Sequence, residues 1–270
     1  MKKKAYFSGP RPLAFAHRGG ANRWPENTLL AFQGAIELGF THIETDVHLT
    51  RDGEFVCFHD DRLERTTNGT GFLRDYDLAS LRELDAAYHF RDRKGGFPYR
   101  GKGHRIPTLD EALALDENVR FNIELKPRDR AAAEKLVRLV LDRGLEDRVL
   151  LAAADDATNR MIRRRIGGKI ATSPGAKEIF FFWLLARLGL SRLWRPSFDA
   201  LQVPTEHGPL RVVDPRFIRA AHVHGIQVHV WTIDDEAEMR RLAQLGVDGI
   251  MTDEPELLLR TLGRSSAHES

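Results

Sequence analysis

The sequence predicts an α/β protein in which helices cover a parallel sheet. Predicted strands and helices take turns along the chain, which is typical of βαβ units. With 270 residues, of which 42% are hydrophobic, the chain can bury one large core. An α/β chain of this length can form one domain. A single domain is therefore the economical prediction.

The first strand and the first helix have clear boundaries in the sequence. Residues 12–17 are apolar until they reach His17, and two glycines soon afterwards allow a sharp turn and leave room for a ligand. Residues 27–38 form the first predicted helix. Asn27 is its candidate cap and a glycine follows its end.

The later elements continue the alternation. Residues 55–59 return from a turn as an extension that carries His59. Residues 60–105 are polar and dotted with glycines, which indicates an insertion after the second strand. The remaining strands are predicted at 41–50, 120–126, 149–153, 169–172, 200–203, 227–232 and 249–252, and the remaining helices at 109–115, 130–143, 216–224, 236–245 and 256–262.

Two predicted strands carry acidic side chains on a single face. Glu44 and Asp46 share one face of the second strand, because successive strand residues point to opposite sides. Two such carboxylates repel each other unless a cation lies between them. Oxygen ligands favour Mg²⁺ or Ca²⁺ over Zn²⁺. Glu124 and Lys126 repeat the pattern on the third strand, so Glu124 can be a third ligand.

Four motifs in this order resemble the glycerophosphodiester phosphodiesterase family. They are HRGGANRWPENT, ETDVHLTRDGEFVCFHD, NIELKP and VHVWTIDDEAEMRRLAQLGVDGIMTDEP, and the resemblance covers about residues 13 to 262. It implies a (β/α)₈ TIM barrel with a small insertion after the second strand. The expected organisation is an N-terminal tail at 1–11, a single barrel domain at 12–264 with its insertion at about 60–105, and a C-terminal tail at 265–270.

The resemblance also implies roles for individual residues. These residues fall at or near the ends of predicted strands, where the active sites of such barrels lie. The implied metal ligands are Glu44, Asp46 and Glu124, the acid/base pair is His17 and His59, the phosphate-binding cations are Arg18 and Lys126, and the aromatic residue of the substrate pocket is Trp231.

The implied activity is metal-dependent hydrolysis of glycerophosphodiesters to an alcohol and glycerol phosphate. A divalent cation, Mg²⁺ or Ca²⁺, would bind a phosphate oxygen and the nucleophile, while the two basic side chains spread the remaining negative charge. One histidine would take a proton from the nucleophile and the other would give one to the leaving alcohol. Water and a neighbouring glycerol hydroxyl both remain candidate nucleophiles.

The segment IFFFWLLARLGLSRLW, residues 179–194, carries the most information about the substrate. It is too short, and too interrupted by Arg187 and Arg192, to span a bilayer. One interpretation is an ordinary barrel helix. The other is an apolar wall or interfacial anchor that accepts an acyl chain, with Arg187, Arg192 and Arg195 near anionic headgroups. The segment is similar to the lysophospholipase D branch of the family, which implies lysophospholipids as substrates and lysophosphatidic acid as a product.

Composition excludes several other classes of protein. The net charge of +2 and the lack of a basic stripe argue against nucleic acid as a partner. Cys57 is the single cysteine, which excludes an intrachain disulfide and a cysteine-based zinc site. The start, MKKKAYFSGPRP, has the charges of a signal peptide without its apolar stretch. The expected location is the cytoplasm, with or without membrane contact.

Two other functions are compatible with a barrel of this kind. A metal-dependent amidohydrolase on the same barrel would carry a His-X-His pair at the first strand, where this chain has His-Arg-Gly. A noncatalytic lipid-binding barrel is the alternative function. It would not need both histidines and all three acidic ligands, and none of these residues is lost.

Some residues also have simpler interpretations. His48 shares a face with the ligands, but a supporting or structural role is favoured over metal binding. Trp231 can alternatively be plain barrel packing. His222, His224 and His229 suggest a metal cluster, but the first two lie at a helix end, which argues against it.

Overall fold

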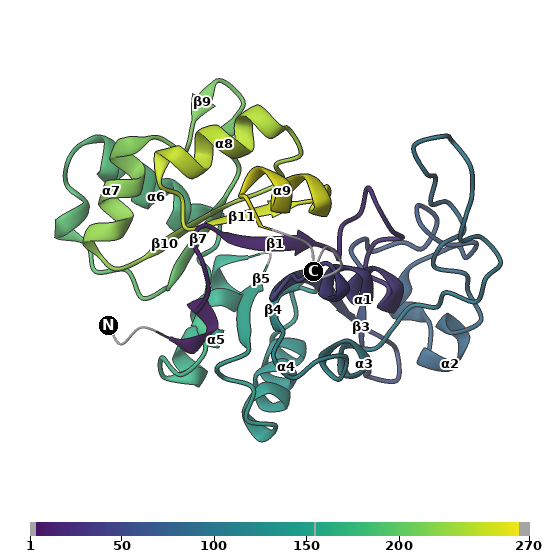
Figure 1. Ribbon diagram of the computed structural model, residues 1–270. Helices are drawn as coiled ribbons and strands as arrows, with labels where there is room; N and C mark the ends of the chain where they lie inside the picture. The colour runs from purple at the N-terminus through teal and green to yellow at the C-terminus, as the bar shows by residue number, and fades with distance from the viewer. Residues whose placement is uncertain (1–3, 154, 265–270) are drawn as a thin grey trace.

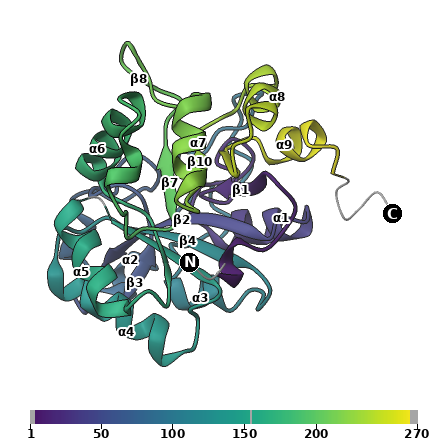
Figure 2. The same cartoon turned by 90° about the vertical axis from the view of Figure 1, so that its left-hand side faces the viewer.

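Figures 1 and 2 show the computed structural model, which describes residues 4–153 and 155–264. Within these residues, eight parallel strands form a nearly closed barrel with helices outside, so the predicted (β/α)₈ fold is confirmed. The first barrel strand, β1 (Leu13–His17), pairs with β2 (His42–Leu49) and with the last strand, β11 (Gly249–Thr252), which closes this side of the barrel. The barrel strands are β1 (Leu13–His17), β2 (His42–Leu49), β4 (Arg120–Leu125), β5 (Val149–Ala153), β6 (Ala171–Thr172), β7 (Ala200–Val203), β10 (Gln227–Val230) and β11 (Gly249–Thr252).

The helices cover the outside of the barrel. The larger ones are α1 (Leu29–Glu37), α4 (Arg130–Asp142), α5 (Asp156–Ile166), α6 (Ala176–Arg187), α7 (Pro215–Val223), α8 (Glu236–Leu245) and α9 (Pro255–Thr261). None of the helices in the described ranges combines the length and the apolar character needed to cross a membrane. α5 was not predicted from the sequence, because its buried face is mostly polar and carries only two large apolar side chains, Ile162 and Ile166.

The predicted cap of the first helix is wrong by one residue. Thr28 is the N-cap of α1, and its hydroxyl accepts a hydrogen bond from the backbone N–H of Ala31. Asn27 has a φ of +55° and directs its side chain toward the barrel mouth instead. Gly19 has a φ of +86°, and a Cβ there would lie 2.7 Å from the Cβ of Ala31. The close approach of α1 to the turn after β1 therefore requires glycine.

The predicted insertion begins after a short hairpin at the second barrel strand. β3 (Phe55–Cys57) pairs antiparallel with β2 and returns the chain to the barrel mouth. The segment beyond it contains η2 (Leu73–Asp75) and α2 (Leu78–Leu81), and α3 (Leu109–Leu113) follows it. It has a small apolar core of its own, formed by Val56, Phe58, Leu63, Leu73, Leu81, Ala86 and Ile106.

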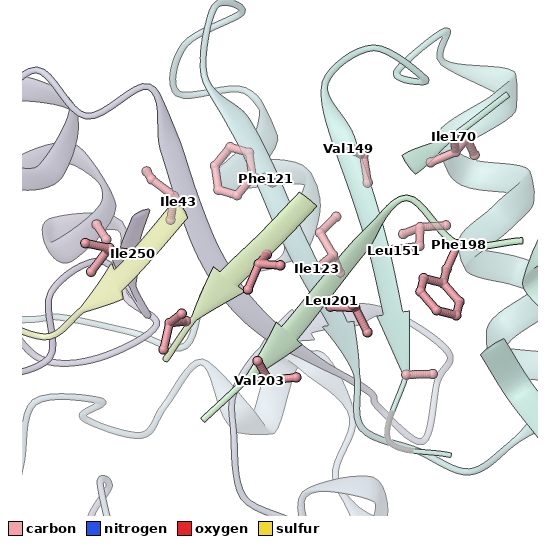
Figure 3. Close-up of a cluster of buried hydrophobic side chains, with 14 of the residues drawn as sticks. Ile43, Phe121, Ile123, Val149, Leu151, Ile170, Phe198, Leu201, Val203 and Ile250 are labelled. Carbon is pink, nitrogen blue, oxygen red and sulfur yellow. The ribbon is translucent and has the colours of Figure 1, made fainter. Parts of the chain in front are cut away.

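The main core lies between the strands and the outer helices (Figure 3). Outward-facing strand residues such as Ile43, Phe121 and Leu201 are fully buried there. Because strand residues alternate, their neighbours in sequence point into the barrel. Ile43 on the outside thus places Glu44 on the inside, where the polar side chains of β2 and β4 gather.

The N-terminal end of the barrel is closed by residues that precede the first strand. η1 (Ala5–Phe7) places Tyr6 and Phe7 against Phe15 and other buried apolar side chains of the strands. The segment 4–11, part of the predicted N-terminal tail, thus contributes to the floor of the barrel. The predicted C-terminal tail, 265–270, lies outside the described residues.

Two histidines, His42 and His229, are buried in this floor. The buried position of His229 makes the stability of the fold depend on pH. The Nε2 of His229 is 2.9 Å from the side-chain oxygen of Gln227, and its buried Nδ1 has no hydrogen-bond partner within residues 4–153 and 155–264. Burial lowers the pKa of His229 well below its usual value. The positive charges of Arg11 and His42 lower it further. A histidine with a depressed folded-state pKa stabilises the fold fully above the unfolded-state pKa and loses this contribution as the pH falls.

We therefore expect His229 to lower the free energy of unfolding below about pH 6.5, by up to about 1.4 kcal/mol for each pH unit. Urea unfolding of the wild type and of His229→Gln at pH 7 and pH 5 measures the effect. The variant should lose less stability between the two pH values. His222→Gln, a change in an exposed histidine, serves as the control. Equal losses in the wild type and in His229→Gln would contradict the prediction.

Candidate active site

The register of three neighbouring strands brings the predicted site residues to the carboxyl end of the barrel. His17 at the end of β1 pairs with Glu44 of β2, and Asp46 of β2 pairs with Glu124 of β4. Lys126 follows directly after β4. Residues predicted from three separate motifs therefore lie at one barrel mouth.

The three predicted metal ligands form an acidic cluster. One carboxylate oxygen from each of Glu44, Asp46 and Glu124 lies within 4.8 Å of the others, and the first two side chains are buried. Burial, together with the charge of Asp46, raises the pKa of Glu44 to about 8. Burial also disfavours the charged form of Asp46, but Lys126 and Arg18 outweigh it and lower the pKa of that carboxyl. Buried carboxylates in such a group have the chemistry of a site for a hard divalent cation.

Two basic side chains balance part of this negative charge. Lys126 Nζ is 2.8 Å from a carboxylate oxygen of Asp46 and 3.2 Å from one of Glu124. Arg18 Nε is 3.3 Å from Asp46, and its Nη1 donates to Glu26 at 3.0 Å. Both predicted phosphate-binding cations thus face the acidic cluster, where they can also contact a bound phosphate.

Each predicted catalytic histidine is held by a carboxylate at Nδ1. The Nδ1 of His17 lies 2.8 Å from a carboxylate oxygen of Asp253, which follows β11. The Nε2 of His17 lies 3.7 Å from a carboxylate oxygen of Glu44. For His59 the partner is Asp60 at 2.5 Å. Burial lowers the pKa of His17, but the charges of Glu44 and Asp253 outweigh burial and raise it to about 9. A carboxylate at Nδ1 fixes the ring orientation and leaves Nε2 free for proton transfer.

An ion-pair network that includes Arg65 of the insertion supports His59 through its partner Asp60. Arg65 donates to the carboxylate of Asp60 and, through both terminal nitrogens, to that of Glu26 at 2.7 Å. Glu26 in turn accepts from Arg18. No role was predicted for Glu26, Asp60, Arg65 or Asp253. Glu26, Asp60 and Asp253 stand inside quoted motifs, and this is the only signal that could have marked them.

Two further polar residues of the mouth have supporting positions. Asn27 donates to Asp46 at 3.2 Å, and its oxygen accepts from the Thr45 hydroxyl at 2.7 Å. The Nε2 of His48 lies 3.0 Å from the carbonyl oxygen of His59. His48 therefore anchors the loop that carries His59, as the supporting role predicted for it requires.

A hollow with an apolar wall lies beside the polar site. Its volume is about 330 Å³. Gln202 is one of its lining residues and donates to Asn122 inside the barrel at 3.0 Å, so the hollow opens beside the acidic strands. Trp231, which is 42% exposed, forms part of this wall. The other lining residues are Ala176, Ile179, Phe180, Trp183, Pro204, His207, Leu210 and Val212.

The three histidines near the end of the chain do not form a cluster. His222 pairs with Asp248 at 2.8 Å, the Nε2 of His224 lies 3.0 Å from the carbonyl oxygen of Ser191, and His229 is in the floor of the barrel. The three side chains therefore have separate partners and do not converge on one point.

A barrel with acidic, basic and histidine side chains gathered at its carboxyl end is a framework for enzymes that act on phosphate esters. Residues 17–257 match the model of the glycerophosphoryl diester phosphodiesterase family. The chain belongs to this family, as the resemblance of its motifs predicted.

Individual relatives agree with this assignment. A glycerophosphodiester phosphodiesterase from Caldanaerobacter subterraneus subsp. tengcongensis is 33% identical over 92% of this chain and 97% of its own length. Human lysophospholipase D GDPD1 is 25% identical over 93% of this chain and 86% of its own length. The structure of an Oleispira antarctica phosphodiesterase with the product sn-glycerol-3-phosphate is 26% identical, covers 97% of this chain and all of its own, and has a TM-score of 0.73.

Proposed function

We propose that this enzyme hydrolyses glycerophosphodiesters to an alcohol and glycerol phosphate with a divalent cation, Mg²⁺ or Ca²⁺, at Glu44, Asp46 and Glu124. The observation that carries the proposal is the buried acidic cluster with Lys126 and two carboxylate-bonded histidines beside it. The product in the Oleispira antarctica relative, sn-glycerol-3-phosphate, supports the same bond cleavage. Incubation with glycerophosphocholine tests the proposal, because choline and glycerol phosphate should appear in equal amounts.

The chain's own residues divide the chemistry between them. A bound cation polarises the phosphate and neutralises charge that develops on its oxygens. Arg18 and Lys126 add positive charge beside that position, where it stabilises the transition state. His17 and His59 act as the acid/base pair. One accepts the proton of the nucleophile, water or a glycerol hydroxyl, and the other donates a proton to the leaving alcohol.

The preferred substrates in this proposal are lysophospholipids. The apolar hollow beside the site has the size of a small-ligand pocket, which begins at about 300 Å³, and aromatic side chains of α6 and Trp231 form its wall. A single acyl chain is apolar enough to occupy it, whereas a deacylated diester has no group that matches it. The human relative named lysophospholipase D supports this choice.

Peripheral contact with a membrane through residues 179–194 is the second part of this proposal. The outer face of α6 exposes Phe180, Phe181 and Leu184, and Leu188 follows them on the same side at 60% exposure. We call these four residues the α6 apolar stripe. Phe182 and Ala186 on the opposite face are buried, so α6 both packs on the barrel and presents an apolar surface. Arg187 does not fit the expected role near headgroups, because it pairs with Asp214 at 2.5 Å.

A pair of neighbouring phenylalanines can test the acyl-chain pocket. Phe180 lines the hollow and Phe181 does not, although both are about half exposed. We expect Phe180→Asp to lower kcat/KM for monomeric lysophosphatidylcholine by about tenfold or more, because the contact of one aromatic side chain is worth roughly 1.5–3 kcal/mol. Turnover of glycerophosphocholine should stay unchanged.

Phe181→Asp is the matched control for this experiment. It places the same charge on the same helix outside the hollow, so the kcat/KM for monomeric lysolipid should stay near the wild-type value. A Phe180→Asp enzyme that cleaves the lysolipid as well as the wild type would refute the acyl-chain assignment.

A further inference from the structure

An arginine-lined groove lies between α4 and α5, apart from the catalytic residues. Its volume is about 500 Å³. It begins at Arg128, two residues after Lys126, and runs along α5 as far as Arg165 in its last turn. Five arginines and one carboxylate line it. The lining residues are Arg128, Arg130, Asp155, Ala157, Thr158, Arg160, Met161, Arg164 and Arg165.

Among the residues that the structure describes, carboxylates compensate only part of the positive charge of this groove. Arg130 and Arg165 both pair with Glu134, at 3.1 and 3.0 Å. Asp155 caps α5 and accepts hydrogen bonds from two backbone N–H groups and a threonine hydroxyl. The other three arginines make no ion pair with another described residue; they are Arg128, Arg160 and Arg164.

This arrangement favours an anionic ligand with several oxygens. Like charges that line one concave surface repel one another, and a bound anion relieves the repulsion. The guanidinium group presents a planar set of donors that matches phosphate geometry. A phosphate group is therefore the ligand chemistry that the groove fits.

The groove is rigidly connected to the α6 apolar stripe. Asp156 in the first turn of α5 accepts hydrogen bonds from the backbone N–H groups of Lys177 and Glu178 in α6. Arg163 of α5 donates to both carboxylate oxygens of Glu178, at 2.6 and 2.7 Å. α4, α5 and α6 follow one another around the outer wall of the barrel, as Figure 2 shows.

We propose that the groove binds the phosphate of an anionic phospholipid in a membrane surface. The proposal rests on the membrane contact of α6 proposed above. An apolar surface beside a basic one is the composition of proteins that lie on anionic bilayers. Here the apolar stripe enters the interface while Arg128, Arg160 and Arg164 take a headgroup. Because Phe180 belongs to the stripe and to the acyl-chain hollow, this orientation places that hollow at the lipid surface.

Vesicle binding tests the proposal separately from catalysis. The experiment compares sedimentation of the full chain with phosphatidylcholine vesicles that contain or lack phosphatidylglycerol. Arg160→Glu/Arg164→Glu should reduce binding to the anionic vesicles at least about tenfold, since each basic residue near such a surface contributes about 1 kcal/mol. Arg138→Glu/Arg260→Glu makes the same change in net charge on exposed residues outside the groove and should bind nearly as well as the wild type.

Three results would overturn the proposal. Equal losses in the two double variants, or normal binding by the groove variant, would overturn the proposal. So would saturable binding of inorganic phosphate to the groove, measured by calorimetry, without vesicle binding, because the ligand would then be a soluble anion. Turnover of glycerophosphocholine should be unchanged in both variants. If the wild type did not cleave glycerophosphocholine, the proposed function would be wrong, whereas lipid binding by the groove would be unaffected.

Discussion

Replacing His17 by Ala is expected to lower the kcat for glycerophosphocholine by about 10²- to 10⁴-fold, the usual contribution of a general acid or base. The bond from Nδ1 to Asp253 directs the other ring nitrogen toward the acidic cluster, where a substrate phosphate would lie. An alanine removes the proton-transfer group and leaves the surrounding charges in place. His59→Ala should have an effect of the same size, since Asp60 holds its ring in the same way.

Steady-state kinetics and thermal unfolding together check this expectation. The Tm of His17→Ala should fall only modestly, because the variant loses the contacts of the ring with Glu44 and Asp253 but no part of the apolar core. His222→Ala is the control, since this histidine forms an exposed ion pair with Asp248 and should retain full turnover. If His17→Ala kept wild-type turnover, His17 would have no place in the mechanism.

The position of the acidic residues could be predicted because strand geometry is regular. Alternation along β2 places Ile43 in the core and Glu44 in the mouth, and both follow from the sequence pattern. The resemblance of the four motifs to the family then implied a barrel, in which these strands meet. Predicted helix ends were less accurate, because Asn27 and Thr28 are both good capping residues and only tertiary contacts decide between them.

The supporting partners of the site could not be predicted in the same way. Asp253 is 236 positions from His17, and its motif contains several other acidic residues, so the motif alone does not mark it as the partner of His17. Arg65 lies in an irregular segment without a period, so its contacts to Glu26 and Asp60 depend on how the insertion folds. Arg187 is an example of a predicted contact that a distant residue replaces. It was expected near lipid headgroups, but it pairs with Asp214.

Removing divalent cations is expected to abolish turnover of glycerophosphocholine, and adding Mg²⁺ or Ca²⁺ should restore it. Without a cation, Glu44, Asp46 and Glu124 share only the charges of neighbouring basic residues, and the pKa of Glu44 is raised. A cation that binds only the folded state also stabilises it. At a concentration of about 100 times Kd, the Tm should rise by about 5–10 °C.

Glu124→Gln separates a metal site from a merely structural cluster. The half-buried Glu124 side chain is the most accessible of the three ligands, so its replacement should disturb packing little. The variant should need a higher cation concentration for activity and show a smaller rise in Tm, whereas Glu37→Gln on the exposed face of α1 should behave as the wild type. Activity that survives EDTA, with no rise in Tm on adding either cation, would mean that Lys126 and Arg18 alone neutralise the cluster and that the phosphate is activated without a metal.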